Sequence, residues 1–249
     1  MGYTPRTFAE GGKSLRHIVV VLCLIAALAG CRQPPPEYVS HYTAPPSSSP
    51  ASVAAEAAVA IIGGAYTAGT EWGGNGPDGW PALIAAQLRQ QGTAIVPFVG
   101  AEDGSGYVTP GDYQGKVFAD QIPAVVRPND RLVIVFGSLS DTDVPAEELQ
   151  PAVRQTLDSA SAAAPQAKIV VIGPAWTDPN PPDNVLQARD VIRTEAGLTG
   201  AIFVDPIAEG WFINRPDLIG SDGMHPTNAG HTVMAEKIAL LIGQQLQSP

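Results

Sequence analysis

Asp222 and His225 stand three residues apart, directly before the last helical pattern of the chain. A turn of this length can bring the carboxylate to one imidazole nitrogen and fix the tautomer of the ring, which leaves the other nitrogen free to act as a base. The same spacing also occurs where a turn aspartate and a surface histidine precede a helix. The pair therefore predicts acid–base chemistry only if the fold brings a reacting group to it.

Three glycine-containing segments are the candidates to meet this pair. Residues 63–69 read GGAYTAG, residues 104–107 read GSGY, and residues 136–141 read FGSLSD. Each follows a short apolar run that predicts a buried strand. Glycines at such points are also common in ordinary turns, so position along the fold must decide their role.

The strand and helix patterns predict how these segments are placed. Short apolar runs at 58–62, 94–98, 132–136, 168–172 and 201–204 predict strands, and helical patterns occur at 80–91, 146–164, 184–196 and about 227–246. Thr227 is a candidate N-cap of the last helix. The alternation predicts a three-layer α/β/α fold with a five-stranded, flavodoxin-like parallel sheet. Such sheets bind ligands beyond the carboxyl ends of their strands, where all four segments fall.

In these segments the chain resembles the SGNH/GDSL hydrolases, a family of esterases and lipases. The first family block, GDSxxxG, matches at Gly63 and Gly69, but Gly64 replaces the aspartate and Ala65 replaces the nucleophilic serine. The last block, DxxH, matches fully at Asp222 and His225. The resemblance implies that these two residues are a retained catalytic dyad, with Ala65 at the nucleophile position and its backbone N–H at the oxyanion site.

The two middle blocks of the family are altered or ambiguous. The family's second block is a glycine whose N–H helps to hold the oxyanion; Gly106 is aligned with it, with Gly104 as the alternative. The third block is GxND, and Ser140 stands where the oxyanion-binding asparagine is expected. A serine hydroxyl can donate a hydrogen bond, but its reach is shorter, and one lost oxyanion donor costs about 10²- to 10³-fold in rate.

Two functions remain open from the sequence. The first is a catalytically silent hydrolase homologue that binds an acyl or glycan ligand of the envelope, or a protein partner, in the family's cleft. The second is an active carboxylic-ester hydrolase that uses another nucleophile or a water activated by His225. Thr67, Ser105 and Ser138 are the hydroxyls near strand ends, and each is expected to be a turn residue rather than a substitute nucleophile.

Other site patterns are weaker. Residues 74–79 satisfy GxGxxG, but the dinucleotide motif needs its first glycine directly after the strand. His225 and His231 are six residues apart rather than the four that place two ligands on one helix face, so no metal site is expected. The sequence predicts no cofactor.

The N-terminus predicts export. Residues 1–17 carry three basic side chains, and the apolar run 18–30 is too short for a membrane span but typical of a signal peptide. The run ends in LAGC and resembles a lipobox, which implies cleavage after residue 30, lipidation of Cys31 and a membrane anchor. Residues 31–55 are rich in Pro and Ser and predict a tether, so the hydrolase-like domain is expected at 56–249 on the extracytoplasmic side.

Charge excludes one class of partner. Without residues 1–30 the chain carries 11 Lys and Arg against 23 Asp and Glu. No basic footprint for nucleic acid is present. The expected partners are therefore the membrane, through the lipid, and an acyl-ester or envelope glycan ligand.

Overall fold

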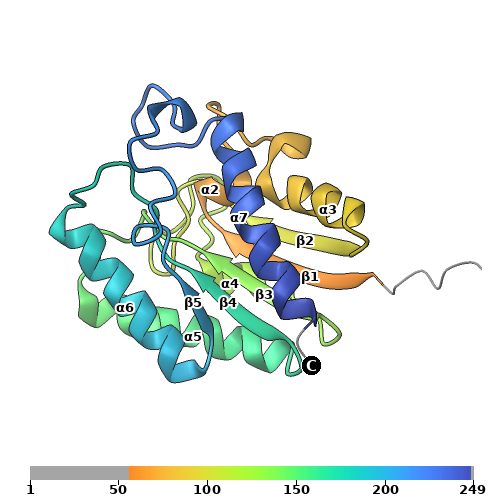
Figure 1. The fold of residues 1–249 in the computed structure, drawn as a ribbon. Coiled ribbons are helices and arrows are strands. Elements are labelled where there is room, and N and C mark those ends of the chain that lie inside the picture. The colour runs from red at the N-terminus through yellow and green to blue at the C-terminus, as the bar shows by residue number, and fades with distance from the viewer. Residues whose placement is uncertain (1–55, 248–249) are drawn as a thin grey trace, which may run out of the picture. The chain divides into compact units, whose positions relative to one another are not determined.

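The computed structural model describes residues 56–247, which form the predicted three-layer α/β/α fold (Figure 1). Its sheet contains five parallel strands in the order β2-β1-β3-β4-β5. The strands are β1 (Ala57–Gly63), β2 (Ile95–Ala101), β3 (Leu132–Phe136), β4 (Lys168–Ile172) and β5 (Ile202–Val204). The chain order reverses direction between β1 and β3, and this is where open parallel sheets form their ligand crevices.

Helices cover both faces of the sheet (Figure 1). One face packs against α3 (Trp80–Gln90) and α7 (Asn228–Gln247); the other packs against α4 (Phe118–Val125), α5 (Ala146–Ala163) and α6 (Asp183–Thr199). Successive strand residues alternate between the two cores, as the twofold repeat of a strand requires. Ile61 belongs to the α3/α7 core, and its neighbour Ile62 belongs to the α4/α5/α6 core.

The structure differs from the sequence prediction mainly around α4 and β2. Helix α4 was not predicted, because it has only eight residues and contains Pro123, which interrupts the helical signal. Strand β2 continues to Ala101, three residues beyond the predicted end, because residues 99–101 pair with Ile61–Gly63 of β1. The loop between β2 and α4 therefore covers residues 102–117, a shorter stretch than the predicted gap between the strands at 94–98 and 132–136, and it contributes to the site.

The start of α7 agrees with the prediction. Thr227 caps this helix, since its hydroxyl accepts the N–H of Gly230 at 3.3 Å and its carbonyl accepts the N–H of His231 at 2.9 Å. Because the dyad segment lies immediately before Thr227, the cap fixes the point at which that segment joins the helix.

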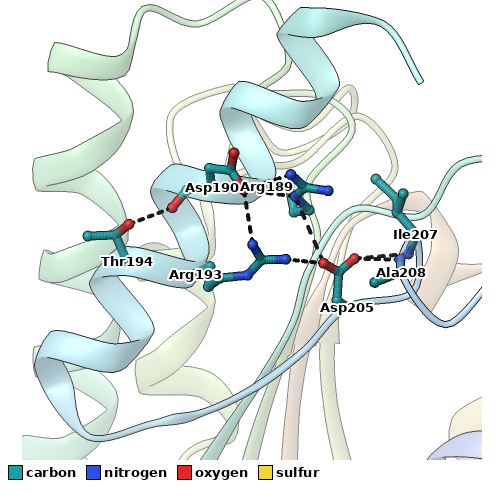
Figure 2. Close-up of polar contacts among 7 residues, drawn as sticks. All are labelled: Arg189, Asp190, Arg193, Thr194, Asp205, Ile207 and Ala208. Atoms are coloured by element: carbon teal, nitrogen blue, oxygen red, sulfur yellow. Dashed lines mark hydrogen bonds and ion pairs between the residues drawn. The ribbon is translucent and has the colours of Figure 1, made fainter. Parts of the chain in front are cut away.

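An ion-pair cluster fixes the chain where it leaves β5 (Figure 2). Arg193 of α6 donates to Asp205, and Arg189 lies 3.9 Å from the same carboxylate. The other oxygen of Asp205 accepts the N–H groups of Ile207 and Ala208. The carboxylate thus joins α6 to the first turn of the long connection that leads to the dyad.

Residues 1–55 lie outside the described part, so the predicted signal peptide, Cys31 lipid site and tether remain predictions. Within residues 56–247 the structure contains no helix that is both long and apolar enough to cross a membrane.

Candidate active site

A cavity of about 430 Å³ lies at the carboxyl ends of the strands. Its walls come from the turn after β1, the loops after β2, β3 and β4, and the dyad segment; they include Ala65, Gly104, Ser140, Ala175 and His225. The structure thus brings Ala65, Ser140 and His225 to one cavity. The other two expected site residues, Gly106 and Asp222, do not line it; Asp222 lies behind the His225 ring, bonded to its Nδ1.

The dyad is formed. Nδ1 of His225 lies 2.5 Å from Oδ2 of Asp222, and Oδ1 of Asp222 accepts the N–H groups of Met224 and His225 at 3.0 and 3.1 Å. Burial raises the pKa of Asp222, but these N–H donors and the His225 ring outweigh it, so its pKa lies below the ordinary value. The carboxylate therefore stays ionised and orients the ring, leaving Nε2 as the nitrogen available to a ligand.

Tyr66 connects the turn after β1 to the dyad segment. Its hydroxyl donates to the carbonyl oxygen of Met224 at 2.6 Å, and its ring packs edge-on against Phe136 and Phe212. Burial raises the pKa of this phenol, so it remains a donor. Because Met224 and His225 are adjacent, this bond ties the dyad segment to the turn that carries Ala65. Sequence reasoning did not assign this role to Tyr66.

Ala65 is the first residue of α2 (Ala65–Ala68), a single helical turn. The carbonyl of Gly64 accepts the N–H groups of Thr67 and Ala68 at 2.9 Å each, while the N–H of Ala65 has no acceptor among residues 56–247. A free N–H at this place matches the expected oxyanion donor. The backbone of the nucleophile turn is therefore formed, although residue 65 has no hydroxyl.

Gly64 is held by a close backbone approach. A Cβ added at this position would lie 2.5 Å from the carbonyl oxygen of Ser105, closer than side-chain carbons come to such atoms. Glycine is therefore the residue that fits at this position. It lets the turn after β1 pack directly on the loop after β2.

The expected role of Gly106 does not agree with the structure. Its N–H donates to the carbonyl of Thr109 at 2.8 Å, and a Cβ at this position would overlap the carboxylate of Asp141. Gly104, the alternative, does line the cavity, but its N–H donates to Oδ1 of Asp103 at 2.8 Å. Neither glycine offers a free donor, so the oxyanion site contains fewer groups than the family pattern implies.

Asp141 explains the position of Gly106. This carboxylate is fully buried and accepts the N–H groups of Tyr107, Val108 and Thr109 at 2.6, 3.2 and 2.9 Å. It thereby holds the loop after β2 against the loop after β3. The sequence pattern alone gave Asp141 no role; the available signal was an acidic residue in the short segment that follows a buried strand.

The hydroxyls around the cavity are mostly committed to other bonds. Ser105 donates to the Lys116 carbonyl, and Thr142 donates to the Leu139 carbonyl. Thr67 is buried without a partner, but it does not line the cavity. Ser138 and Ser140 also line the cavity, and within the described residues neither hydroxyl has a hydrogen-bond partner; the Oγ of Ser138 is buried as well.

His231 has a structural position rather than a ligand position. It is buried in α7, where its Nδ1 accepts the N–H of Trp80 at 3.4 Å and its ring packs on Gly74. Burial lowers its pKa to about 4, against a smaller opposing effect of Asp78. Residues 56–247 contain no cluster of three or more His, Cys, Asp or Glu side chains suited to a metal ion.

Comparison with known proteins places this geometry in a family. The sequence model of the GDSL-like lipase/acylhydrolase family matches residues 61–233. The chain is 45% identical over 191 residues to the GDSL lipase Rv0518 of Mycobacterium tuberculosis, covering 76% of this chain and 82% of that protein.

Two solved structures share the fold. TesA superposes with a TM-score of 0.63 at 19% identity, covering 76% of this chain and 99% of TesA. Est24, a carbohydrate acetylesterase from Sinorhizobium meliloti, superposes with a TM-score of 0.56 at 15% identity, with coverages of 76% and 99%. At these identities the two superpositions support the architecture alone.

Proposed function

Because this chain belongs to the GDSL-like lipase/acylhydrolase family, we propose that its domain binds an O-acylated ligand in the cavity lined by Ala65 and His225 and hydrolyses it poorly. The observation that carries this proposal is the side chain of residue 65. A methyl group lines the cavity together with His225, at the position where the family motif has the nucleophilic serine.

The expected losses in kcat favour binding of an ester over its turnover. Removing the serine from a serine–histidine–aspartate triad costs about 10⁶-fold in kcat, and what remains comes from binding and the oxyanion site. In this domain that site is reduced as well, because the N–H groups of Gly104 and Gly106 are bonded internally and Ser140 replaces an amide. A water activated by His225 would lack the fixed orientation of an attached nucleophile.

The remaining parts of the cavity suit a ligand. The free N–H of Ala65 can donate to an ester carbonyl, and Nε2 of His225 can hydrogen-bond the ester or its alcohol. Phe136, Leu139 and Ala175 add apolar wall for a short acyl chain. These groups recognise an ester without needing to cleave it.

The proposal includes an envelope location. The short apolar run that ends in LAGC and the Pro- and Ser-rich segment after it support a lipid anchor at Cys31 and a tethered domain outside the cytoplasm. Replacing Cys31 with Ser should move the protein from the membrane to the soluble or secreted fraction and abolish labelling by fatty acid. An unchanged membrane fraction in the variant, with no labelling of the parent, contradicts the anchor.

The proposed lack of catalysis is tested by measuring ester turnover together with active-site labelling. Purified wild type and His225→Ala are assayed on p-nitrophenyl acetate, and both are treated with a fluorophosphonate probe. We expect no labelling and equal, near-background rates. Hydrolysis by wild type that His225→Ala abolishes would refute silence.

The alternative is an active ester hydrolase with a displaced nucleophile. One observation favours it: the Oγ of Ser138 is unpaired on the cavity wall, on the same wall as Ser140. If wild type proves active, Ser138→Ala should abolish both turnover and fluorophosphonate labelling. Ser105→Ala is the matched control, because the Ser105 hydroxyl is already engaged with the Lys116 carbonyl.

A further inference from the structure

A second cavity, of about 810 Å³, adjoins the first. Asp103 and His225 line both cavities, so a single ligand can extend from one into the other past the imidazole. We call the second cavity the outer groove. Its remaining lining residues are Ala68, Gly69, Thr70, Glu71, Trp72, Asn75, Ala101, Glu102, Tyr113, Gln114 and Asp222.

Trp72 stands on one wall of the outer groove at the tip of a rigid turn. Thr70 and Gly73 exchange two backbone hydrogen bonds at 2.9 and 3.2 Å, and the Thr70 hydroxyl accepts the N–H of Trp72. The indole rests on Gly220, where an added Cβ would lie 2.7 Å from the ring. The side chain is nevertheless 36% exposed, so its position is fixed while part of its surface faces the groove.

Tyr113 stands on the groove wall contributed by the loop after β2, and its loop is rigid as well. The carboxylate of Glu102 accepts the N–H groups of residues 113–116, and the N–H of Gly111 donates to the Lys116 carbonyl at 3.0 Å. The hydrogen bond from Gln114, helped by its neighbours, outweighs burial and lowers the pKa of Glu102. Tyr113 itself is 84% exposed and adds nothing to the core.

The outer groove is lined by four carboxylates, those of Glu71, Glu102, Asp103 and Asp222. Neither Lys nor Arg occurs among its lining residues. Glu102 is saturated by backbone donors, Asp222 is paired with His225, and Asp103 accepts the N–H of Gly104. Glu71 is exposed, and with the amides of Asn75 and Gln114 it completes a polar wall that repels anions and in which three of the four carboxylates already have partners.

We propose that the outer groove binds a neutral saccharide, whose O-acyl substituent enters the first cavity beside Ala65. A sugar ring has apolar C–H faces that pack on aromatic rings and a rim of hydroxyl donors that suit carboxylate and amide oxygens. Rigid aromatic side chains bind with little loss of conformational entropy. The volume of the groove suits several sugar units, which distinguishes an oligosaccharide from a compact cationic headgroup.

This inference rests on the proposed function, because the acyl group must still occupy the first cavity, but it is measured separately. Calorimetry measures the binding of unacylated neutral tetrasaccharides to the protein that lacks only residues 1–30. The probes are cellotetraose, chitotetraose and mannotetraose. The protonated glucosamine tetrasaccharide and tetramethylammonium serve as cationic probes, and a galacturonate tetrasaccharide serves as the anionic probe. We expect binding of at least one neutral probe, and none of the anion.

Variants identify the surface. Trp72→Ala and Tyr113→Ala should each raise the dissociation constant at least about fivefold, as truncation of an aromatic binding residue typically does. Leu240→Ala, at an exposed apolar residue of α7, is the matched control and should leave the constant unchanged. Thermal unfolding of each variant confirms that the fold persists.

Several outcomes overturn the inference. They are failure of every neutral probe to bind, preferential binding of the cations, or neutral binding that both aromatic variants retain. None of these depends on ester turnover. A wild type that hydrolyses p-nitrophenyl acetate through His225 would refute silence while leaving the saccharide result intact.

Discussion

The two sides of the cavity differ in whether they supply the side chains that ester hydrolysis needs. On one side, Asp222 and His225 keep a bonded dyad with a carboxylate held ionised by backbone donors. On the other side, the turn at 63–69 has the backbone of a nucleophile turn with a free N–H, but Ala65 supplies no oxygen. The difference teaches that the positioning of a site and its reacting atoms are separable, because the first depends on backbone contacts and the second on single side chains.

Tyr66 shows why the dyad side does not depend on a hydroxyl at residue 65. The phenol reaches the carbonyl of Met224 from the turn after β1, so the two sides are joined through residue 66 rather than residue 65. A substitution at 65 leaves this connection in place. The comparison therefore predicts that chemistry can be restored from the nucleophile side.

The largest expected effect is that of Ala65→Ser. A serine oxygen would join a base that is already oriented, and the rate on p-nitrophenyl acetate should rise at least about 10³-fold above wild type, below the full 10⁶-fold value of a triad serine. Fluorophosphonate labelling should appear with it. His225→Ala in the same background must remove both signals; an inert but folded Ala65→Ser variant would mean that the cavity no longer aligns the two sides.

The next effect concerns the oxyanion site. Ser140→Asn in the Ala65→Ser background should raise kcat by up to about 10²-fold, because an amide reaches further than a hydroxyl towards a developing oxyanion. The gain should appear in kcat rather than KM, since the added bond forms in the transition state. Without Ala65→Ser the change should have no effect, and an equal gain in wild type would point to a nucleophile other than residue 65.

Gly64→Asp would match the family motif at this position, yet it should lower both stability and rate. Its Cβ meets the Ser105 carbonyl, so we expect a loss of about 1–3 kcal/mol in the free energy of unfolding and, in the Ala65→Ser background, a rate lowered about tenfold. Gly197→Asp on α6, where the Cβ position is open, is the control for the added charge. Chemical denaturation and initial rates measure both effects, and a faster, equally stable Gly64→Asp variant would contradict the close approach.

The smallest effect is a pH dependence of stability through His231, which binds the segment after the nucleophile turn to α7. Its pKa of about 4 lies below the ordinary value of 6.5, so between these values the unfolded state binds more protons. The free energy of unfolding should therefore fall as pH decreases from about 6.5 to 4. His231→Gln should flatten this decline in urea titrations, and a decline of wild-type size in the variant would contradict the assignment to His231.

Much of this architecture could be predicted from the sequence. The alternating apolar runs identified all five strands, and the DxxH spacing identified Asp222 and His225, because both signals are local. The oxyanion role predicted for Gly106 was wrong, because its N–H already donates to the carbonyl of Thr109. Residue type alone does not reveal whether an N–H is free. Asp141 and Tyr66 act on partners 32 to 158 residues away, and such contacts exist only in the fold.

The close approach of Gly64 to the Ser105 carbonyl also limits the order in which this site can change over evolutionary time. A serine can replace Ala65 in one step, since the backbone of the turn that would present it is formed. An aspartate can return at position 64 only after the loop carrying Ser105 has moved away. A chain that changes towards the full family motif would therefore be expected to pass through an intermediate in which a serine at position 65 is preceded by glycine.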